Sequence, residues 1–246
     1  MIDTPIGLTL GFGPTRKLPG IYIYNGPGVS LNALGHTKRF FQKIGLQICE
    51  ISPLQVIEGG WEEKAALFVL PGGADIPYRK ELNGVGNQRI RSFVEKGGAF
   101  LGICAGSYYA GAFVDFDAPP FVQEKRELSF FPGVVKGPVF EGYDPNSLQG
   151  ARAVILKWGD ETCPFFYHGG GHFVDADRME NVSVIASYDT QKQESAIIQC
   201  SVGKGQAILS AVHFEYDPIL FSILEERNED RLRLSVQLMR QYFLME

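Results

Sequence analysis

The chain has 246 residues, of which 45% are hydrophobic and 21% are charged, and this composition suits one α/β domain with a well-developed core. The formal net charge of −5 and the lack of a long basic run argue against nucleic-acid and anionic-membrane partners. No stretch approaches the roughly 18 apolar residues of a membrane helix, and the start lacks a signal-peptide pattern. Four cysteines without a CxxC pair fit a reducing compartment, so we expect a cytoplasmic protein.

The first half of the chain alternates between short apolar runs and helical patterns. After an irregular arm expected over residues 1–19, the pattern predicts four strands and two crossover helices: strands 20–24, 46–51, 66–70 and 99–103, and helices 31–44 and 87–95. This alternation is typical of a parallel sheet. The following stretch, 115–145, is rich in Pro, Phe and Gly, and we interpret it as hairpins and loops packed on the sheet edge.

Strand patterns return in the second half. They cover residues 151–156, 182–188, 195–200 and 206–212, and the glycine turn at 202–205 predicts a hairpin between the last two. Residues 228–244 place apolar side chains on one side of a helix, which should close the core. The sequence therefore predicts a single α/β domain over 1–246, with a mostly parallel central sheet and an antiparallel extension.

Cys104 has the setting of a nucleophile elbow. It lies between Gly102 and Gly106, directly after the apolar run 99–103 and before a segment that can form a helix. A sharp strand-to-helix turn holds its corner residue in a strained conformation, and flanking glycines keep the neighbouring chain clear of the side chain. The helix N-terminus also favours a thiolate over a thiol. Cys104 is therefore a candidate nucleophile.

Two further motifs supply the groups that acyl transfer by a thiol needs. His213 follows the predicted strand 206–212, and Glu215 lies two positions on, so in an extended chain both side chains face the same way. A carboxylate can then orient one imidazole nitrogen while the other contacts Cys104. The turn after strand 66–70 ends in Gly73, whose N–H, with that of Ala105, can form an oxyanion hole.

Each motif alone has a simpler explanation. A GxCxG segment is often a tight turn around a buried thiol, His-x-Glu is often a salt bridge, and Pro-Gly-Gly is often only a turn. All three follow predicted strands, however, and ligands of open α/β sheets collect at the carboxyl ends of the strands. Their joint occurrence therefore favours a Cys/His/Glu site.

The motifs resemble those of the class I glutamine amidotransferase-like superfamily, in which an elbow cysteine acts with a late histidine and glutamate. A narrower resemblance, to the amidotransferase-like N-terminal domain of eukaryotic-type biotin protein ligase, covers most of the chain. It rests on the His213 segment and on YNGPG (24–28), LPGGADIPY (70–78), GICAGSY (102–108), FFPG (130–133) and GGGHF (169–173). The resemblance implies a flavodoxin-like three-layer sandwich, with Cys104, His213 and Glu215 as the triad.

Two departures from the family patterns qualify this expectation. Where glutamine-using enzymes commonly have a glutamine after the elbow, Ser107 and Tyr108 follow Gly106, which disfavours glutamine as substrate. The sequence also contains no biotin ligase catalytic domain, so we do not expect it to biotinylate a protein by itself. The expected substrate contacts are Gly72, Asp75, Ser107, Tyr108, Tyr167 and His172.

No cofactor or metal is expected. Three glycines between His168 and His172 break the helix that would align two ligands, so we interpret this segment as a flexible loop lining the Cys104 pocket. The glycine pairs elsewhere lack the third glycine of a dinucleotide fingerprint. The sequence predicts a thiol-dependent amidase or amidotransferase-like hydrolase of a small amide or carboxylate compound. The alternatives are a non-catalytic small-molecule-binding or regulatory module linked to biotin metabolism, and a cysteine peptidase.

Overall fold

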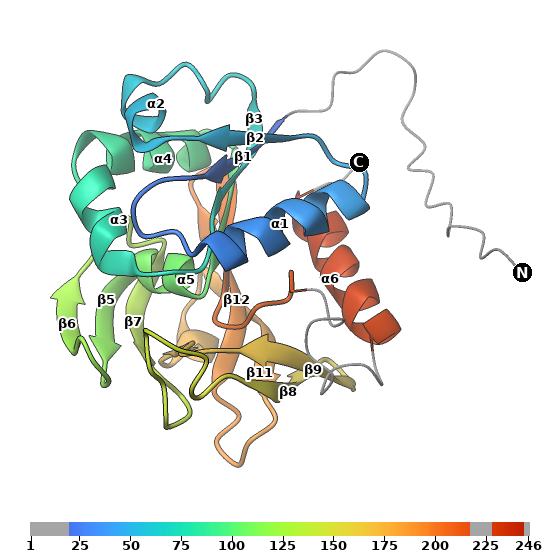
Figure 1. Ribbon diagram of the computed structural model, residues 1–246. Coiled ribbons are helices and arrows are strands. Elements are labelled where there is room, and N and C mark those ends of the chain that lie inside the picture. Colours follow the sequence, from blue (N-terminus) through green and yellow to red (C-terminus); the bar gives the residue numbers. More distant parts are fainter. Residues whose placement is uncertain (1–19, 217–227, 244–246) are drawn as a thin grey trace, which may run out of the picture.

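A nine-stranded mixed sheet forms the centre of the molecule (Figure 1). The computed structural model describes residues 20–216 and 228–243, so the arm predicted at 1–19 lies outside the described residues. The strand order is β2-β1-β3-β4-β13-β12-β11-β8-β9. The first five are parallel: β1 (Gly20–Tyr24), β2 (Ile48–Ile51), β3 (Ala65–Leu70), β4 (Ala99–Ile103) and β13 (Gly205–Ser210).

The remaining strands of this sheet continue from β13 in antiparallel fashion. They are β12 (Ser195–Val202), β11 (Val182–Tyr188), β8 (Arg152–Trp158) and β9 (Glu161–Tyr167). The predicted parallel centre with an antiparallel extension is therefore confirmed, including the hairpin between β12 and β13. Strand β9 was not predicted; its Pro164 is tolerated because β9 is an edge strand, where a missing backbone N–H removes no inner ladder bond.

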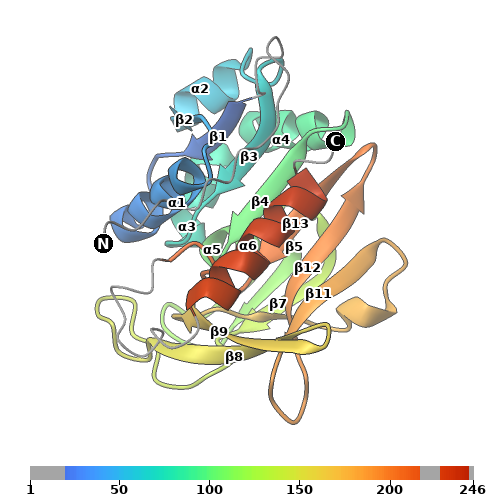
Figure 2. The same ribbon diagram turned by 90° about the vertical axis from the view of Figure 1, so that its right-hand side faces the viewer.

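Helices cover both faces of the sheet, which gives the three layers that the resemblance implied. On one face lie α1 (Leu31–Lys43) and α6 (Asn228–Phe243), and Figure 2 shows α6 in front of β4 and β13. The other face carries α2 (Pro53–Glu58), α3 (Asp75–Leu82), α4 (Val85–Glu95) and α5 (Ala105–Tyr109). Alternate strand residues feed the two cores: in β4, Leu101 packs with the α1 and α6 side chains and Phe100 with the opposite cluster.

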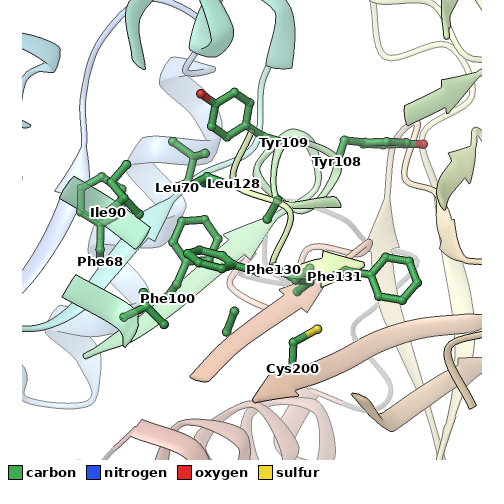
Figure 3. Close-up of a cluster of buried hydrophobic side chains, with 14 of the residues drawn as sticks. Phe68, Leu70, Ile90, Phe100, Tyr108, Tyr109, Leu128, Phe130, Phe131 and Cys200 are labelled. Atoms are coloured by element: carbon green, nitrogen blue, oxygen red, sulfur yellow. The ribbon is translucent and has the colours of Figure 1, made fainter. Parts of the chain in front are cut away.

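The stretch 115–145 is more ordered than predicted. Strands β5 (Gly111–Phe116) and β6 (Val122–Lys125) do form a hairpin, but they belong to a second sheet of order β10-β7-β5-β6, with β7 (Phe131–Gly137) and β10 (His172–Phe173). This sheet packs on a face of the central sheet rather than on its edge, since Phe130 contacts Phe100 at 5.1 Å between ring centroids (Figure 3). The predicted hairpin is therefore present, but its placement on the sheet edge was wrong. Parallel pairing of β5 with β7 joins segments separated by a chain that contains Pro119 and Pro120, whose local pattern favours a turn.

Helices α2 and α3 and the short 3₁₀ helix η1 (Ala176–Arg178) were also not predicted. For α2 the sequence carried a usable signal, because Ser52 and Gln55 form a capping box and Pro53 takes the first helical position. Predicted strand 206–212 ends early, at Ser210, and the chain then leaves the ladder. This early end places His213 beyond the strand.

Candidate active site

Three neighbouring inner strands bring the candidate residues together at their carboxyl ends. Strands β3, β4 and β13 are adjacent and parallel, with Leu70 opposite Gly102 and Ile103 opposite Ser210. The segments that follow them therefore leave the sheet side by side. They carry the Gly72-Gly73 turn, Cys104 and His213.

The corner at Cys104 is strained and closely packed. Its φ of 51° and ψ of −108° lie outside the regions that side chains prefer, and its N–H donates to Ser210 O at 2.8 Å. A Cβ added at Gly106 would lie 2.1 Å from Leu70 O, and one at Gly102 would lie 2.5 Å from Gly106 O. Only glycine fits on either side of the cysteine, which is the physical reason for the GxCxG pattern.

His213 and Glu215 form a buried pair beside this corner. The Nδ1 of His213 donates to Glu215 Oε1 at 2.7 Å, and both residues are only 4% exposed. The His213 backbone N–H donates to Phe166 O at 2.9 Å, which ties the segment to edge strand β9. Glu215 Oε2 has no hydrogen-bond partner among the described residues. The hydrogen bond to the imidazole is therefore the one that the carboxylate makes to another described residue.

The electrostatics of the pair favour a protonated imidazole. Burial lowers the pKa of His213, but the charge of Glu215, the neighbouring Cys104 side chain and hydrogen bonds to both groups outweigh it and raise the pKa to about 10. At neutral pH an imidazolium thus faces the sulfur of Cys104. Such a neighbour stabilises a thiolate, which is the nucleophilic form of cysteine.

The Gly72-Gly73 turn packs against both groups. A Cβ at Gly72 would lie 2.6 Å from His213 Cε1 and 3.5 Å from Cys104 Cβ, so a side chain here would have to displace the imidazole. Gly73 has a φ of +152°, and a Cβ there would lie 2.0 Å from Gly28 O. Ala105 is the first residue of α5, where an N–H has no intrahelical acceptor. Neither Gly73 nor Ala105 donates a backbone hydrogen bond to another described residue.

A pocket of about 100 Å³ opens beside the thiol. Its lining comes from five parts of the chain: Gly73–Ile76; Cys104, Ala105 and Tyr108; Val114, Phe116, Pro120 and Val122; Tyr143 and Pro145; His168 and Gly169. A larger hollow of about 910 Å³ lies around Lys96 and Lys204, at the amino ends of the parallel strands. The candidate nucleophile belongs to the smaller one.

The expected substrate contacts are only partly at this pocket. Asp75 and Tyr108 line it, and Gly72 lies behind it against His213. Ser107 is fully buried and donates to Cys104 O at 2.7 Å, so its hydroxyl supports the elbow instead. Tyr167 and His172 do not line the pocket: Tyr167 donates to Gly170 O at 2.8 Å, and His172 pairs with Lys136 in the second sheet.

His168, rather than His172, is the histidine of this loop that lines the pocket, and the sequence analysis did not propose it as a substrate contact. The Cys104 thiol donates to His168 O at 3.7 Å, and the His168 ring lies 4.9 Å from that of Tyr143. Burial lowers the pKa of His168, which keeps the imidazole neutral. The HGGGH motif pointed to the right segment, but it gave no means of telling which histidine faces Cys104.

The three glycines after His168 are fixed rather than flexible. Each carbonyl of Gly169–Gly171 accepts a hydrogen bond from a buried tyrosine hydroxyl, at 3.1, 2.8 and 2.8 Å, from Tyr108, Tyr167 and Tyr188 in that order. A Cβ at Gly170 would lie 1.9 Å from Ala211 O. We call Gly169–Gly171 the glycine strap. Its glycines serve close packing, and this corrects the interpretation as a flexible loop.

The parallel-centred sheet, with a cysteine at the strand-to-helix corner, defines a class I glutamine amidotransferase-like fold. A chain of PurLQS from Thermotoga maritima shares this fold, with a TM-score of 0.60 over 89% of this chain and 98% of that one, at 13% identity. None of the helices in residues 20–216 and 228–243 is both long and apolar enough to cross a bilayer.

Within this class, the chain belongs to the family described as Biotin-protein ligase, N terminal, whose model matches residues 20–242. The biotin–protein ligase of Schizosaccharomyces pombe is 36% identical over 225 residues, which cover 85% of this chain and 35% of the ligase. The chain thus matches about a third of that relative's length. An uncharacterized protein of Chlamydia muridarum is 37% identical over 217 residues, 84% of each chain.

Proposed function

We propose that the protein is a thiol-dependent amidase or amidotransferase-like hydrolase acting on a small amide. One observation carries this proposal: the Cys104 thiol lies at a strained corner beside an imidazole that Glu215 holds at 2.7 Å. A nucleophile, a base and a group that orients the base are the minimum for covalent acyl transfer.

The proposed cycle uses the chain's own groups and water. The thiolate of Cys104 attacks the amide carbonyl carbon, and the N–H groups of Gly73 and Ala105 donate to the oxygen as its charge develops. When the C–N bond breaks, the His213 imidazolium gives its proton to the leaving amine. Water, deprotonated by the now neutral His213, then hydrolyses the thioester and releases the acid. Glu215 keeps the imidazole oriented throughout.

We place this chemistry in the cytoplasm. All four cysteines are free thiols, and the nucleophile must stay reduced to act. Glutamine is disfavoured as the amide, because Ser107 is committed to the elbow backbone and Tyr108 donates to the glycine strap.

The direct test is alkylation of Cys104 by iodoacetamide as a function of pH, in a Cys49→Ala background that removes the exposed thiol. We expect fast labelling that persists below pH about 7 and is lost in His213→Ala. Cys200 provides an internal contrast, because burial raises its pKa to about 12. Labelling of Cys104 that follows an ordinary thiol, with a midpoint near pH ~8.5 in both proteins, would refute the proposal.

The second candidate is a non-catalytic module that binds a small molecule connected with biotin metabolism. The favouring observations are the thiol's hydrogen bond to His168 O, which occupies the nucleophile, and the absence of a glutamine after the elbow. The S. pombe relative, which is a biotin–protein ligase, supplies the metabolic context. Calorimetric titration with biotin separates the candidates: saturable binding that Cys104→Ala leaves unchanged supports the module.

A further inference from the structure

The walls of the Cys104 pocket are apolar. Ile76, Val114, Phe116, Pro120 and Val122 contribute hydrocarbon surface from α3 and the second sheet. The Phe116 ring makes T-shaped contacts with two tyrosine rings. Its centroid lies 5.4 Å from that of Tyr108 and 5.5 Å from that of Tyr143, with interplanar angles of 85° and 89°. Aromatic packing therefore fixes the shape of the wall.

No cation among the described residues at the pocket is left for a ligand anion. Among the described lining residues, Asp75 is the carboxylate, and its Oδ2 accepts from Arg126 Nε at 2.9 Å and Nη2 at 2.6 Å. The Arg126 side chain is fully buried and also donates to Lys125 O at 3.0 Å, so its charge is satisfied away from the pocket. The neutral His168 completes the titratable lining beside the tyrosines and Cys104.

A ligand anion would therefore enter this pocket without a counter-ion. Amino-acid amides such as glutamine carry a carboxylate, and moving it from water to an apolar site without a counter-ion is unfavourable. The volume of about 100 Å³ is well below the roughly 300–1,000 Å³ of pockets for drug-sized ligands, so the acyl group beyond the reacting carbonyl must be short.

We infer that the pocket takes a small, uncharged, apolar acyl group, of which butyryl is the model, and excludes negatively charged acyl groups. The inference rests on the proposed function, because it names the substrate class of the same site. It assigns the discrimination to the apolar wall, with Ile76 as a specificity-determining residue. Ile76 lies beside Asp75 in the first turn of α3 and is partly exposed.

Two activated esters of similar length test the inference: p-nitrophenyl butyrate and the mono-p-nitrophenyl ester of succinate. In each reaction the Cys104 sulfur bonds to the acyl carbon, the ester C–O bond breaks, and p-nitrophenolate leaves with the electron pair. The burst of p-nitrophenolate gives the acylation rate, and intact mass gives the adduct. We expect acylation by the butyryl ester to be faster by about tenfold or more, after correction for the esters' different rates with free cysteine.

A matched pair of variants locates the discrimination. Ile76→Lys puts a cation at the wall and should lower the butyryl-to-succinyl ratio by about tenfold. Leu54→Lys makes a similar change at the second residue of another helix, α2, at a side chain that is 63% exposed and outside the pocket, and should leave the ratio unchanged. Thermal unfolding checks that both variants fold.

The outcomes separate the inference from the proposed function. Acylation of Cys104 at equal rates by both esters in the wild-type protein overturns the inference and leaves the nucleophile in place. No adduct with either ester overturns the proposed function and the inference together. If Ile76→Lys folds but keeps the wild-type ratio, the assignment to this wall is wrong.

Discussion

The two sides of Cys104 differ in chemistry and in origin. On one side, His213 and Glu215 supply charge and come from a single short segment. On the other, an apolar wall is assembled from α3, the second sheet and the loops around Tyr143 and His168. Under the proposed function, the charged side would supply the groups for thiol-dependent acyl transfer, and the apolar side would select the acyl group. The comparison teaches that the buried charged pair and the apolar pocket wall come from separate parts of the fold, so each can be changed without the other.

Removing the carboxylate charge should have the largest effect, and it tests the charged side directly. Glu215→Gln keeps the shape but removes the charge that raises the pKa of His213, so amide cleavage should fall by a factor on the order of 10³ or more. Ammonia release from butyramide measures it. Glu63→Gln, at an exposed residue outside the site, is the control. Retention of more than about a tenth of the activity would place the catalytic charge elsewhere.

Filling the space behind the imidazole should have the next largest effect. The added methyl of Gly72→Ala would lie 2.6 Å from His213 Cε1 and must displace the ring, so we expect cleavage to fall by about 10²-fold while the fold persists. Gly35→Ala in α1 is the matched control, because its nearest neighbour would be the flexible Arg39 side chain at 3.5 Å. Unchanged kinetics in Gly72→Ala would mean that the position of His213 does not matter.

The pH profile should differ between amides and activated esters. Because the pKa of His213 is raised to about 10, the imidazolium persists up to that pH and is lost above it. Amide cleavage should then fall by about tenfold per pH unit above pH ~10, since the leaving amine needs the proton. Acylation by p-nitrophenyl butyrate should not fall, because p-nitrophenolate leaves unprotonated. Parallel profiles for the two substrates would contradict a general-acid role of His213.

The smallest effect should come from the glycine strap, behind the apolar side. Tyr188→Phe removes the hydroxyl that donates to Gly171 O and should lower the free energy of unfolding by about 1–2 kcal/mol, measured by urea denaturation. The butyryl-to-succinyl ratio should stay unchanged, because Tyr188 does not line the pocket. Tyr22→Phe, at a tyrosine that donates no hydrogen bond to another described residue, is the control. A changed ratio would show that the strap also shapes the wall.

Local patterns carried the elements that place the charged side. Short continuous apolar runs predicted β1, β3, β4 and β13, and the GxCxG pattern follows from contacts that only glycine allows. His213 and Glu215 lie two residues apart, so their shared direction was readable even though the strand ends at Ser210. Their catalytic roles stay predictions.

Long-range packing accounts for most of what was missed. The second sheet joins β5, β7 and β10 across intervening turns, and its Pro-rich and Gly-rich segments look like loops when read locally. The choice of His168 over His172 depends on three tyrosine hydroxyls that hold the glycine strap and are distant in sequence from one another. Local sequence propensity does not predict contacts of this kind.

The sequence by itself determined the α/β class, the corner at Cys104 and the His-x-Glu segment, because each depends on neighbours within a few residues. Only the tertiary structure decided that a largely apolar pocket faces the thiol and that Asp75 forms an ion pair with the buried Arg126. Burial and ion pairing are properties of surfaces brought together from several elements, so they exist only once the chain has packed.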